Sequence, residues 1–474
     1  MNLVSLDEDV LVHIASFLNP VDILRLSETC RAMNKLIHLR IVWTNACSYH
    51  IIAHGYPFPT IPLDEIPTME LMLHTIHSHQ LARRWHDGIS KPRRIKYISG
   101  RLGTTPEVRF LPGKLLLIIS KTVWSTLSVW DYGSAVSKRV CEWSPRGAIL
   151  SGVAVNGDPR SEATVAVAMH LNEKRTVVVL SLKHDGSLYE LLVLQEIQAE
   201  MKPITLEGDI LALSDEVSQT VIWNLKTKTY GLLQHLALLP LQVNECIQVV
   251  FAYQSVLVVR AQTVHLFPFP ELGSHVEISC EPLAEHSFGW VDGQSVNICP
   301  FLSSSRSTTS KMHTPLTIFV RGESDDPWAS DIYNLELYTL EPNPDYTASN
   351  GSPYLFPPRL RDKVACLRGS LTCRRIVLGR LGTAAWIQPR DRFASGLLAD
   401  IPTHLVPSTV AHESLIITAF PGSLSIKDDY GGTVIGKKIF ENEVNAGWTS
   451  FDYDEVGGRV AVASSFGRVT VLEL

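Results

Sequence analysis

The sequence lacks several features that define common protein classes. It has no long run of one charge, and 42 Lys and Arg oppose 48 Asp and Glu, for a net charge of -6. This balance argues against a dedicated nucleic-acid or membrane surface. The eight cysteines include no Cys-x-x-Cys pair, so we expect reduced thiols. The longest apolar stretch, residues 248–260, is too short and too polar to span a bilayer. These absences predict a protein of the cytoplasm, the nucleus or both.

Catalytic and metal-binding motifs are also missing. The chain has no phosphate-binding loop, no nucleophile elbow and no dinucleotide fingerprint, and His412-Glu413 lacks a second histidine at position 416. Four histidines lie close together in the sequence, namely His74, His77, His79 and His86. No acid or cysteine joins them at a spacing that suits zinc. We therefore expect no enzyme activity, no cofactor and no metal, and we interpret these histidines as a solvated helix face.

The apolar residues gather at the N-terminus instead. More than half of residues 1–46 are apolar, against 45% hydrophobic residues in the whole chain. Apolar residues recur at helical spacing after Asp7, a candidate helix cap, and Asn19-Pro20 ends this first helix and begins the next. A last short helix from residue 41 to 46 contains Trp43. So small a unit hides little of its surface, so we expect a three-helix module whose surplus apolar face needs a cover.

The order of these residues resembles the F-box family. The resemblance covers about a tenth of the chain, and two positions depart from the family pattern: Asp7 stands where proline is usual, and Asp9 where glutamate is usual. Both residues still suit the start of a helix. The matching stretches are Ser5–Leu11, Ile14, Phe17–Pro20, Asp22–Ser27, Thr29–Arg31 and Trp43.

The F-box resemblance implies a partner for the apolar face, namely the Skp-type adaptor of a cullin-based ubiquitin ligase. The residues expected to contact the adaptor are Leu6, Val10, Leu11, Ile14, Leu18, Leu24 and Trp43. The alternative is that the helices form a cap that folds onto the rest of the chain.

Residues 47–92 read as a connector. Four prolines between residues 57 and 67 stiffen it, and Pro67 opens a helix that we expect to run to about Trp85. This helix would space the N-terminal module, residues 1–46, from the body, residues 93–474.

The body shows short apolar strands separated by tight turns, which is typical of an all-β fold. The clearest unit is the last one, where three strands follow one another from Thr449 to Leu474. We interpret seven segments as third strands of such units: Thr126–Asp131, Thr176–Ser181, Gln219–Asn224, Thr263–Leu266, Tyr333–Leu337, Thr383–Ile387 and Arg468–Leu474.

These units resemble a divergent WD-repeat β-propeller. We expect seven blades, or eight if Ser423–Ile426 adds a strand. Because the chain stops after a third strand, we expect residues 94–98 to supply the fourth strand and close the ring.

Two insertions, residues 303–311 and 341–358, are expected to form mobile loops on a propeller face. A nearby basic group would suit an acidic or phosphorylated segment, although ordinary surface charge explains it as well. The basic residues are Arg359, Arg361, Lys363, Arg368, Arg374 and Arg375.

Together these features predict a substrate-recognition subunit of a Skp–cullin–F-box ubiquitin ligase, which binds a protein substrate on its propeller. The alternative is a scaffold outside any ligase whose N-terminal helices pack on its own body. A third interpretation, an enzyme with a site in the propeller channel, would need converging acids or histidines. The sequence does not indicate which residues bind the substrate.

Overall fold

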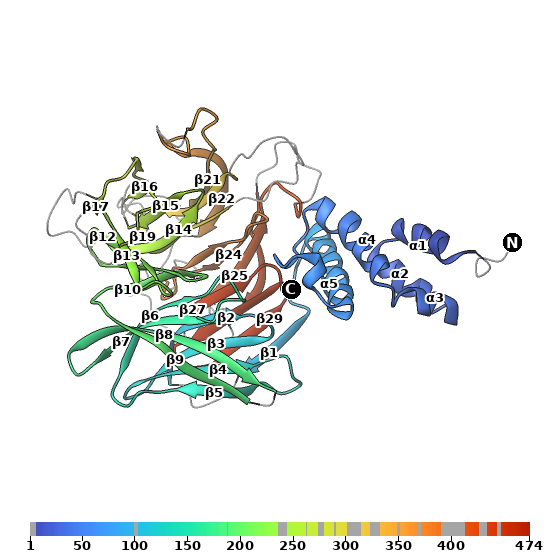
Figure 1. The fold of residues 1–474 in the computed structure, drawn as a ribbon, viewed down its shortest axis with the longest axis horizontal. Helices are drawn as coiled ribbons and strands as arrows, with labels where there is room; N and C mark the ends of the chain where they lie inside the picture. The colour runs from blue at the N-terminus through green and yellow to red at the C-terminus, as the bar shows by residue number, and fades with distance from the viewer. Residues whose placement is uncertain are drawn as a thin grey trace, which may run out of the picture.

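The computed structural model describes residues 6–98, 103–186, 188–235, 244–261, 263–273, 279–288, 291–300, 314–322, 332–347, 351–367, 371–389, 413–425, 434–442 and 447–474. A small group of helices is followed by a ring of β-sheets, and helix α5 lies between the two (Figure 1). No helix within these ranges is long and apolar enough to cross a membrane.

The N-terminal region folds into short helices: α1 (Glu8–Ser16), α2 (Pro20–Ser27), α3 (Arg31–Leu36) and α4 (Arg40–His50). The expected cap of α2 is confirmed, because Asn19 Oδ1 accepts hydrogen bonds from the backbone N–H of Val21 and of Asp22, each at 3.0 Å. Asp7 precedes α1 with an extended backbone, but its side chain makes no capping hydrogen bond.

The helical module differs from the expected three-helix unit in two ways. The chain leaves the helical conformation after Ser27, and a separate helix starts at Arg31, so the described residues of the module form four α-helices, α1 to α4. Helix α4 also continues to His50, four residues past the expected end of the module.

The connector contains two short 3₁₀ turns, η2 (Ile52–His54) and η3 (Leu63–Glu65), and then α5 (Thr68–Asp87). Helix α5 begins directly after Pro67, as its sequence predicts. Arg40 in α4 holds the connector, because its Nη1 donates to the backbone carbonyl of Ile66 at 2.7 Å.

The described strands form seven sheets, each built mainly from strands that are consecutive in sequence. Blade 1 contains β2 (Thr104–Leu111), β3 (Leu115–Lys121), β4 (Ser125–Asp131) and β5 (Lys138–Trp143). Blade 2 contains β6 (Ile149–Val155), β7 (Val165–Leu171), β8 (Lys174–Asp185) and β9 (Leu188–Gln198). Blade 3 contains β10 (Lys202–Glu207), β11 (Ile210–Ser214), β12 (Gln219–Asn224), β13 (Thr229–Gln234) and the added β17 (Ser279–Cys280).

The other blades follow the same order. Blade 4 contains β14 (Cys246–Ala252), β15 (Ser255–Arg260), β16 (Val264–Pro268) and β18 (Ala284–His286). Blade 5 contains β19 (Val291–Pro300), β20 (Leu316–Gly322), β21 (Ile332–Leu340) and β22 (Arg359–Leu367). Blade 6 contains β23 (Ile376–Leu378), β24 (Thr383–Gln388), β25 (Ser414–Ala419) and β26 (Lys437–Glu441). This repeated meander is the topology of a seven-bladed β-propeller.

Blade 7 joins the two ends of the propeller. It contains β27 (Trp448–Asp454), β28 (Arg459–Ser464), β29 (Val469–Glu473) and, as its outer strand, β1 (Arg94–Ile98). Strand β1 pairs with β29 in antiparallel register from Arg94 opposite Glu473 to Ile98 opposite Val469. The expected closing strand is therefore confirmed.

The structure corrects two assignments of strands. The segment Thr383–Ile387 lies in β24, which is the second strand of blade 6, and the third strand is β25. Residues 423–425 form turns rather than an eighth blade's strand, and residue 426 lies outside the described residues. The other six segments interpreted as third strands lie in third strands.

Of the two loops predicted to be mobile, only residues 341–358 lie partly within the described residues. Residues 303–311 lie outside the described residues. In the described part of residues 341–358, Asn343 Nδ2 donates to the Ser352 carbonyl at 2.9 Å and the Tyr354 side chain is buried, so this part is an ordered, hydrogen-bonded loop.

Candidate functional site

Helix α1 carries two apolar stripes that face in different directions. Leu11 and Ala15 are buried in the core of the helical module. Val10 and Phe17 are 43% and 71% exposed, and Ile14 between them is half-buried. Residues three, four and seven positions apart share a helix face, so Val10, Ile14 and Phe17 form one stripe, which we call the exposed α1 stripe.

The remaining predicted contact residues divide between surface and core. Leu6, Leu18 and Leu24 are half-buried against the core of the module. Trp43 is 0% exposed, and its indole Nε1 donates to the Ile37 carbonyl at 2.6 Å. Trp43 is therefore not presented to a partner as expected, because its ring fills the module core and its polar atom is satisfied there.

Phe17 was not among the predicted contact residues, although it is the most exposed of these apolar side chains. Its position seven residues after Val10 was the available signal. The ring of His13 contacts it edge-on, with 5.0 Å between ring centroids. An exposed aromatic side chain next to aliphatic ones is typical of the anchors of protein interfaces.

Most of the surplus apolar surface of the module is covered by the connector and not by another protein. Leu71 of α5 and Ile66 before it belong to the same buried core as Leu11 and Trp43, and Phe58 packs against that core. Among the described residues, no propeller side chain belongs to this core. The expectation that the module cannot shelter all of its apolar residues therefore holds for the exposed α1 stripe and for Ile41 of α4, which is 50% exposed.

The second half of α5 is anchored on the propeller. Leu81 and Trp85 lie in one buried cluster with Tyr453 and Leu472 of blade 7. Nearby, His86 Nε2 lies 2.9 Å from the carbonyl of Ser423, close to blade 6. The two halves of α5 thus belong to two different cores, one in the module and one in the propeller.

The contacts of α5 identify which face of the ring it occupies. In an antiparallel meander, the turns after the first and third strands lie at one end of the blade, and the remaining connections lie at the other. Leu81 approaches Gly458, in the turn after the first strand of blade 7, and His86 contacts the segment after the third strand of blade 6. The opposite face of the propeller is therefore not covered by α5.

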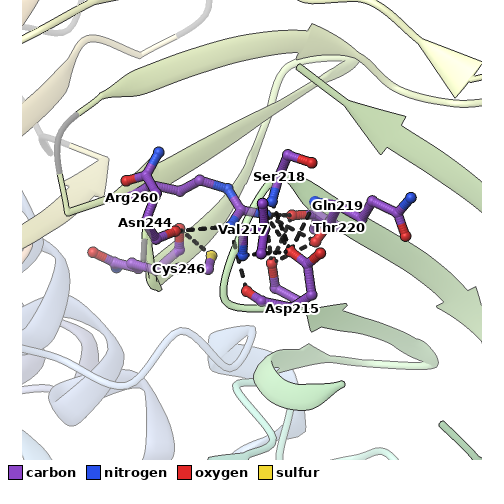
Figure 2. Close-up of polar contacts among 10 residues, drawn as sticks. Asp215, Val217, Ser218, Gln219, Thr220, Asn244, Cys246 and Arg260 are labelled. Carbon is purple, nitrogen blue, oxygen red and sulfur yellow. Dashed lines mark hydrogen bonds and ion pairs between the residues drawn. The ribbon is translucent and has the colours of Figure 1, made fainter. Parts of the chain in front are cut away.

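A buried arginine braces loops at that opposite face (Figure 2). Arg260 ends the second strand of blade 4 and is 1% exposed. Its guanidinium donates to the carbonyl of Asn244 at 2.9 Å and to that of Gln219 at 2.8 Å, and it lies 3.3 Å from Asp215 Oδ1. Asp215 Oδ1 in turn accepts hydrogen bonds from the N–H groups of Ser218 and Gln219.

These contacts connect the loop between β11 and β12 with the segment entering blade 4. Sequence patterns do not predict the network, because the partners of Arg260 lie 16 to 46 residues before it in the chain. A surface that holds a partner gains affinity when its loops are ordered beforehand, so the braced loops are candidates for a binding surface.

The central channel is polar. A cavity of about 420 Å³ lies among the innermost strands, and two arginines line it, Arg109 from blade 1 and Arg375 at the entry to blade 6. Arg109 pairs with Glu107, and Arg375 lies 3.2 Å from Asp452 and 3.8 Å from Glu107. Burial raises the pKa of the Glu107 and Asp452 carboxyls, while Arg109 lowers it.

The channel arginines are thus balanced by carboxylates. The basic group expected from the sequence does not converge either: Lys363, in the outer strand of blade 5, pairs with Glu336 at 2.7 Å, whereas Arg375 faces the channel. Arg368 lies outside the described residues. Within the part of the chain that is described, no group of three or more His, Cys, Asp or Glu could hold a metal ion.

Comparison with known proteins identifies a family match for the N-terminal residues. Residues 5–49 match the family model described as F-box-like. No curated protein matches the chain. The propeller assignment rests on the strand order of the seven sheets.

Three solved structures are similar in outline. A chain of the mitotic checkpoint complex has a TM-score of 0.46 at 10% identity, covering 81% of this chain and 95% of that chain. The WD40 domain of SCAP from fission yeast has a TM-score of 0.41 at 9% identity, covering 78% and 84%. The β-propeller domain of Cps50 (Swd1) from Myceliophteria thermophila has a TM-score of 0.44 at 11% identity, covering 80% and 99%.

Proposed function

We propose that this protein is the substrate-recognition subunit of a Skp–cullin–F-box ubiquitin ligase, and that it is not itself an enzyme. The observation that carries the proposal is the F-box-like match over residues 5–49 together with the exposed α1 stripe, in which Val10 and Phe17 are exposed to solvent. F-box domains bind Skp-type adaptors, and the adaptor binds the cullin. The adaptor would therefore cover Val10, Ile14 and Phe17.

The arrangement of the two parts supports the proposal. Because α5 is packed into the core of the module and into the core of blades 6 and 7, the module is held at a fixed place on one face of the ring. The other face has loops braced by Arg260, and α5 does not cover it, so it would bind a protein substrate. A ligase subunit needs such a separation, because adaptor and substrate must bind at the same time.

The structure favours the ligase role over a scaffold that caps itself. The scaffold interpretation expects the N-terminal helices to pack on the propeller. Only α5, Tyr56 and Ile89 from the helical and connector regions join a propeller core, and α1 does not, among the described residues.

The test is co-purification of a Skp-type adaptor and cullin with the tagged full-length protein. Val10→Asp combined with Phe17→Asp should reduce adaptor recovery at least about a hundredfold, since each large apolar side chain contributes roughly 1.5 to 3 kcal/mol when buried. Leu73→Asp, at a position 58% exposed on α5, is the matched control and should leave recovery unchanged. Normal recovery with the double variant, or no adaptor with the unaltered protein, would reject the proposal.

A further inference from the structure

Helix α5 carries histidines at its contacts with the propeller and with the helical module, and the proposed function gives these histidines no role. His77 and His79 point to different partners of the helix. The electrostatic neighbours of His77 are Arg459 and Asp454 of blade 7, and those of His79 include His50 of α4 and Asp22 of α2. The helix thus places one imidazole at the propeller contact and one at the module contact.

We infer that the packing of α5 against the propeller and the module is sensitive to acid. On mild acidification, the imidazoles of His77 and His79 become cationic and loosen the helix from both neighbours. The inference concerns the conformation of this chain alone and does not depend on a ligase partner.

The hydrogen bonding of both rings supports neutral imidazoles in the seated helix. Nε2 of His77 and Nδ1 of His79 are buried and have no hydrogen-bond partner in the described part of the chain. The same holds for Nε2 of His50, next to His79. A neutral imidazole can leave one ring nitrogen without a proton, but a cationic imidazole has two N–H donors. Protonation would therefore bury a donor without an acceptor, which costs stability.

The charges around His77 reinforce this cost. Burial is the largest cause that lowers its pKa, and Arg459 lowers it further. Asp454 and the backbone groups of Gly457 and Val456 act in the opposite direction. Asp454 also lies 3.8 Å from Arg459, so its charge is shared between the guanidinium and the imidazole.

His79 has a similar environment at the other contact. Burial is again the largest cause of its lowered pKa, followed by His50, Arg83 and His54, and only Asp22 acts in the opposite direction. His74, one turn before His77, also has its pKa lowered by burial and by Arg459, against Glu70. Among the described residues, the carboxylates near these rings therefore do not fully offset the positive charge that protonation would add.

The direction of the pH effect follows from these shifts. A histidine whose pKa is lower in the folded than in the unfolded chain stabilises the fold above pH about 6.5, and this stabilisation is lost as the pH falls below that value. The loss should appear first at α5, because two such rings lie on this one helix, at its contacts with the module and with the propeller.

The test is hydrogen–deuterium exchange of the full-length protein at pH 7.5 and 5.5, with rates corrected for the intrinsic pH dependence of exchange. Between these pH values, peptides from α5 should lose more protection than peptides from β28, by up to about tenfold for each ring, since each pH unit below the unfolded pKa of about 6.5 changes the equilibrium by at most tenfold. His77→Gln and His79→Gln should each reduce this difference, and the double variant should abolish it. His38→Gln, at an exposed position in the module, is the matched control and should retain it.

Equal losses of protection in α5 and β28 would overturn the inference, and so would an undiminished difference in both single variants. The single variants keep the test informative if the double variant does not fold, which circular dichroism at pH 7.5 would reveal.

Discussion

Leu81 of α5 packs directly over Gly458 in the turn between β27 and β28: a Cβ atom added to Gly458 would lie 2.7 Å from Leu81 Cδ1. Gly458 also has a φ of +60°, a backbone conformation that residues other than glycine rarely adopt. This turn therefore connects two strands of the last blade and also contacts the helix that carries the N-terminal module.

Gly458→Ala should weaken the packing of α5 against blade 7. The backbone strain alone costs roughly 1 kcal/mol, and displacement of Leu81 adds to it. Gly208→Ala is a matched control, because Gly208 has a φ of +58° but no atom within 4 Å of an added Cβ. We expect faster proteolysis near residues 88–92 only in Gly458→Ala. Equal effects of the two variants would show that the Leu81 contact does not matter.

Trp43→Ala should destabilise the helical module by about 3 to 5 kcal/mol, as is usual for the loss of a buried aromatic ring. Tyr49→Ala, in the same helix but at a position 59% exposed, should change stability by less than about 0.5 kcal/mol. Urea unfolding monitored by the exchange of α4 peptides would measure both. A small effect of Trp43→Ala would mean that its ring is not part of the module core in solution.

Arg260→Met should destabilise blades 3 and 4 by roughly 3 kcal/mol. The substitution removes the buried guanidinium that donates to the carbonyls of Asn244 and Gln219 and pairs with the Asp215 carboxylate. Arg139→Met removes an exposed ion pair with Glu142 and should have almost no effect. Thermal unfolding would compare the two variants. Similar melting temperatures for both would contradict a bracing role for Arg260.

His235 and His265 predict a second, more local pH effect. Their rings stack with 4.2 Å between centroids. Burial, followed by Arg260, lowers the pKa of His235 to about 4, and burial, followed by His235 and Arg260, lowers that of His265 to about 3. Since both pKa values lie below the unfolded value of about 6.5, stability should fall as the pH drops below 6.5, by up to about 1.4 kcal/mol per pH unit for each ring.

Urea unfolding at pH 7.5, 6 and 5 would measure this slope. The exposed Glu285 carboxylate, 3.6 Å from His265 Nε2, opposes the effect only weakly, because solvent screens it. His265→Gln should reduce the slope, whereas His170→Gln, at an exposed position, should not. An unchanged slope in His265→Gln would rule out this ring as the source.

Deleting residues 469–474 should prevent formation of the complete ring. The deletion removes β29, so β1 loses the strand that it pairs with and β28 loses one of its two neighbours. Size-exclusion chromatography should show an expanded or aggregated species. A deletion of residues 1–5 is the control, and it should elute like the unaltered protein. A compact monomer after loss of β29 would contradict the pairing of β1.

Much of the fold follows from local sequence patterns. The Asn19 cap and the helix after Pro67 depend on neighbouring residues, so both could be predicted. The closing strand could be predicted because a sheet that ends on a third strand leaves an edge to be paired. The assignment of Thr383–Ile387 was wrong because second and third strands show the same apolar pattern, and β25 follows only after a long connection.

The candidate surfaces were harder to predict. The helical period identifies the apolar residues of α1 and α4 but not which of them the core of the module buries. The sequence therefore predicts Leu11 and Trp43 at the surface and does not single out Phe17. The brace around Arg260 depends on contacts between blades, for which sequence spacing gives no signal.

The pairing of β1 with β29 also determines where the molecule would yield to force. The helices precede β1 directly, so tension applied to them is transmitted through residues 88–93 to a strand held by one neighbour. A pull from a bound partner would act on the seam between the first and last strands of the ring, and the buried contacts of Leu81 and Trp85 with blade 7 divert that load away from it.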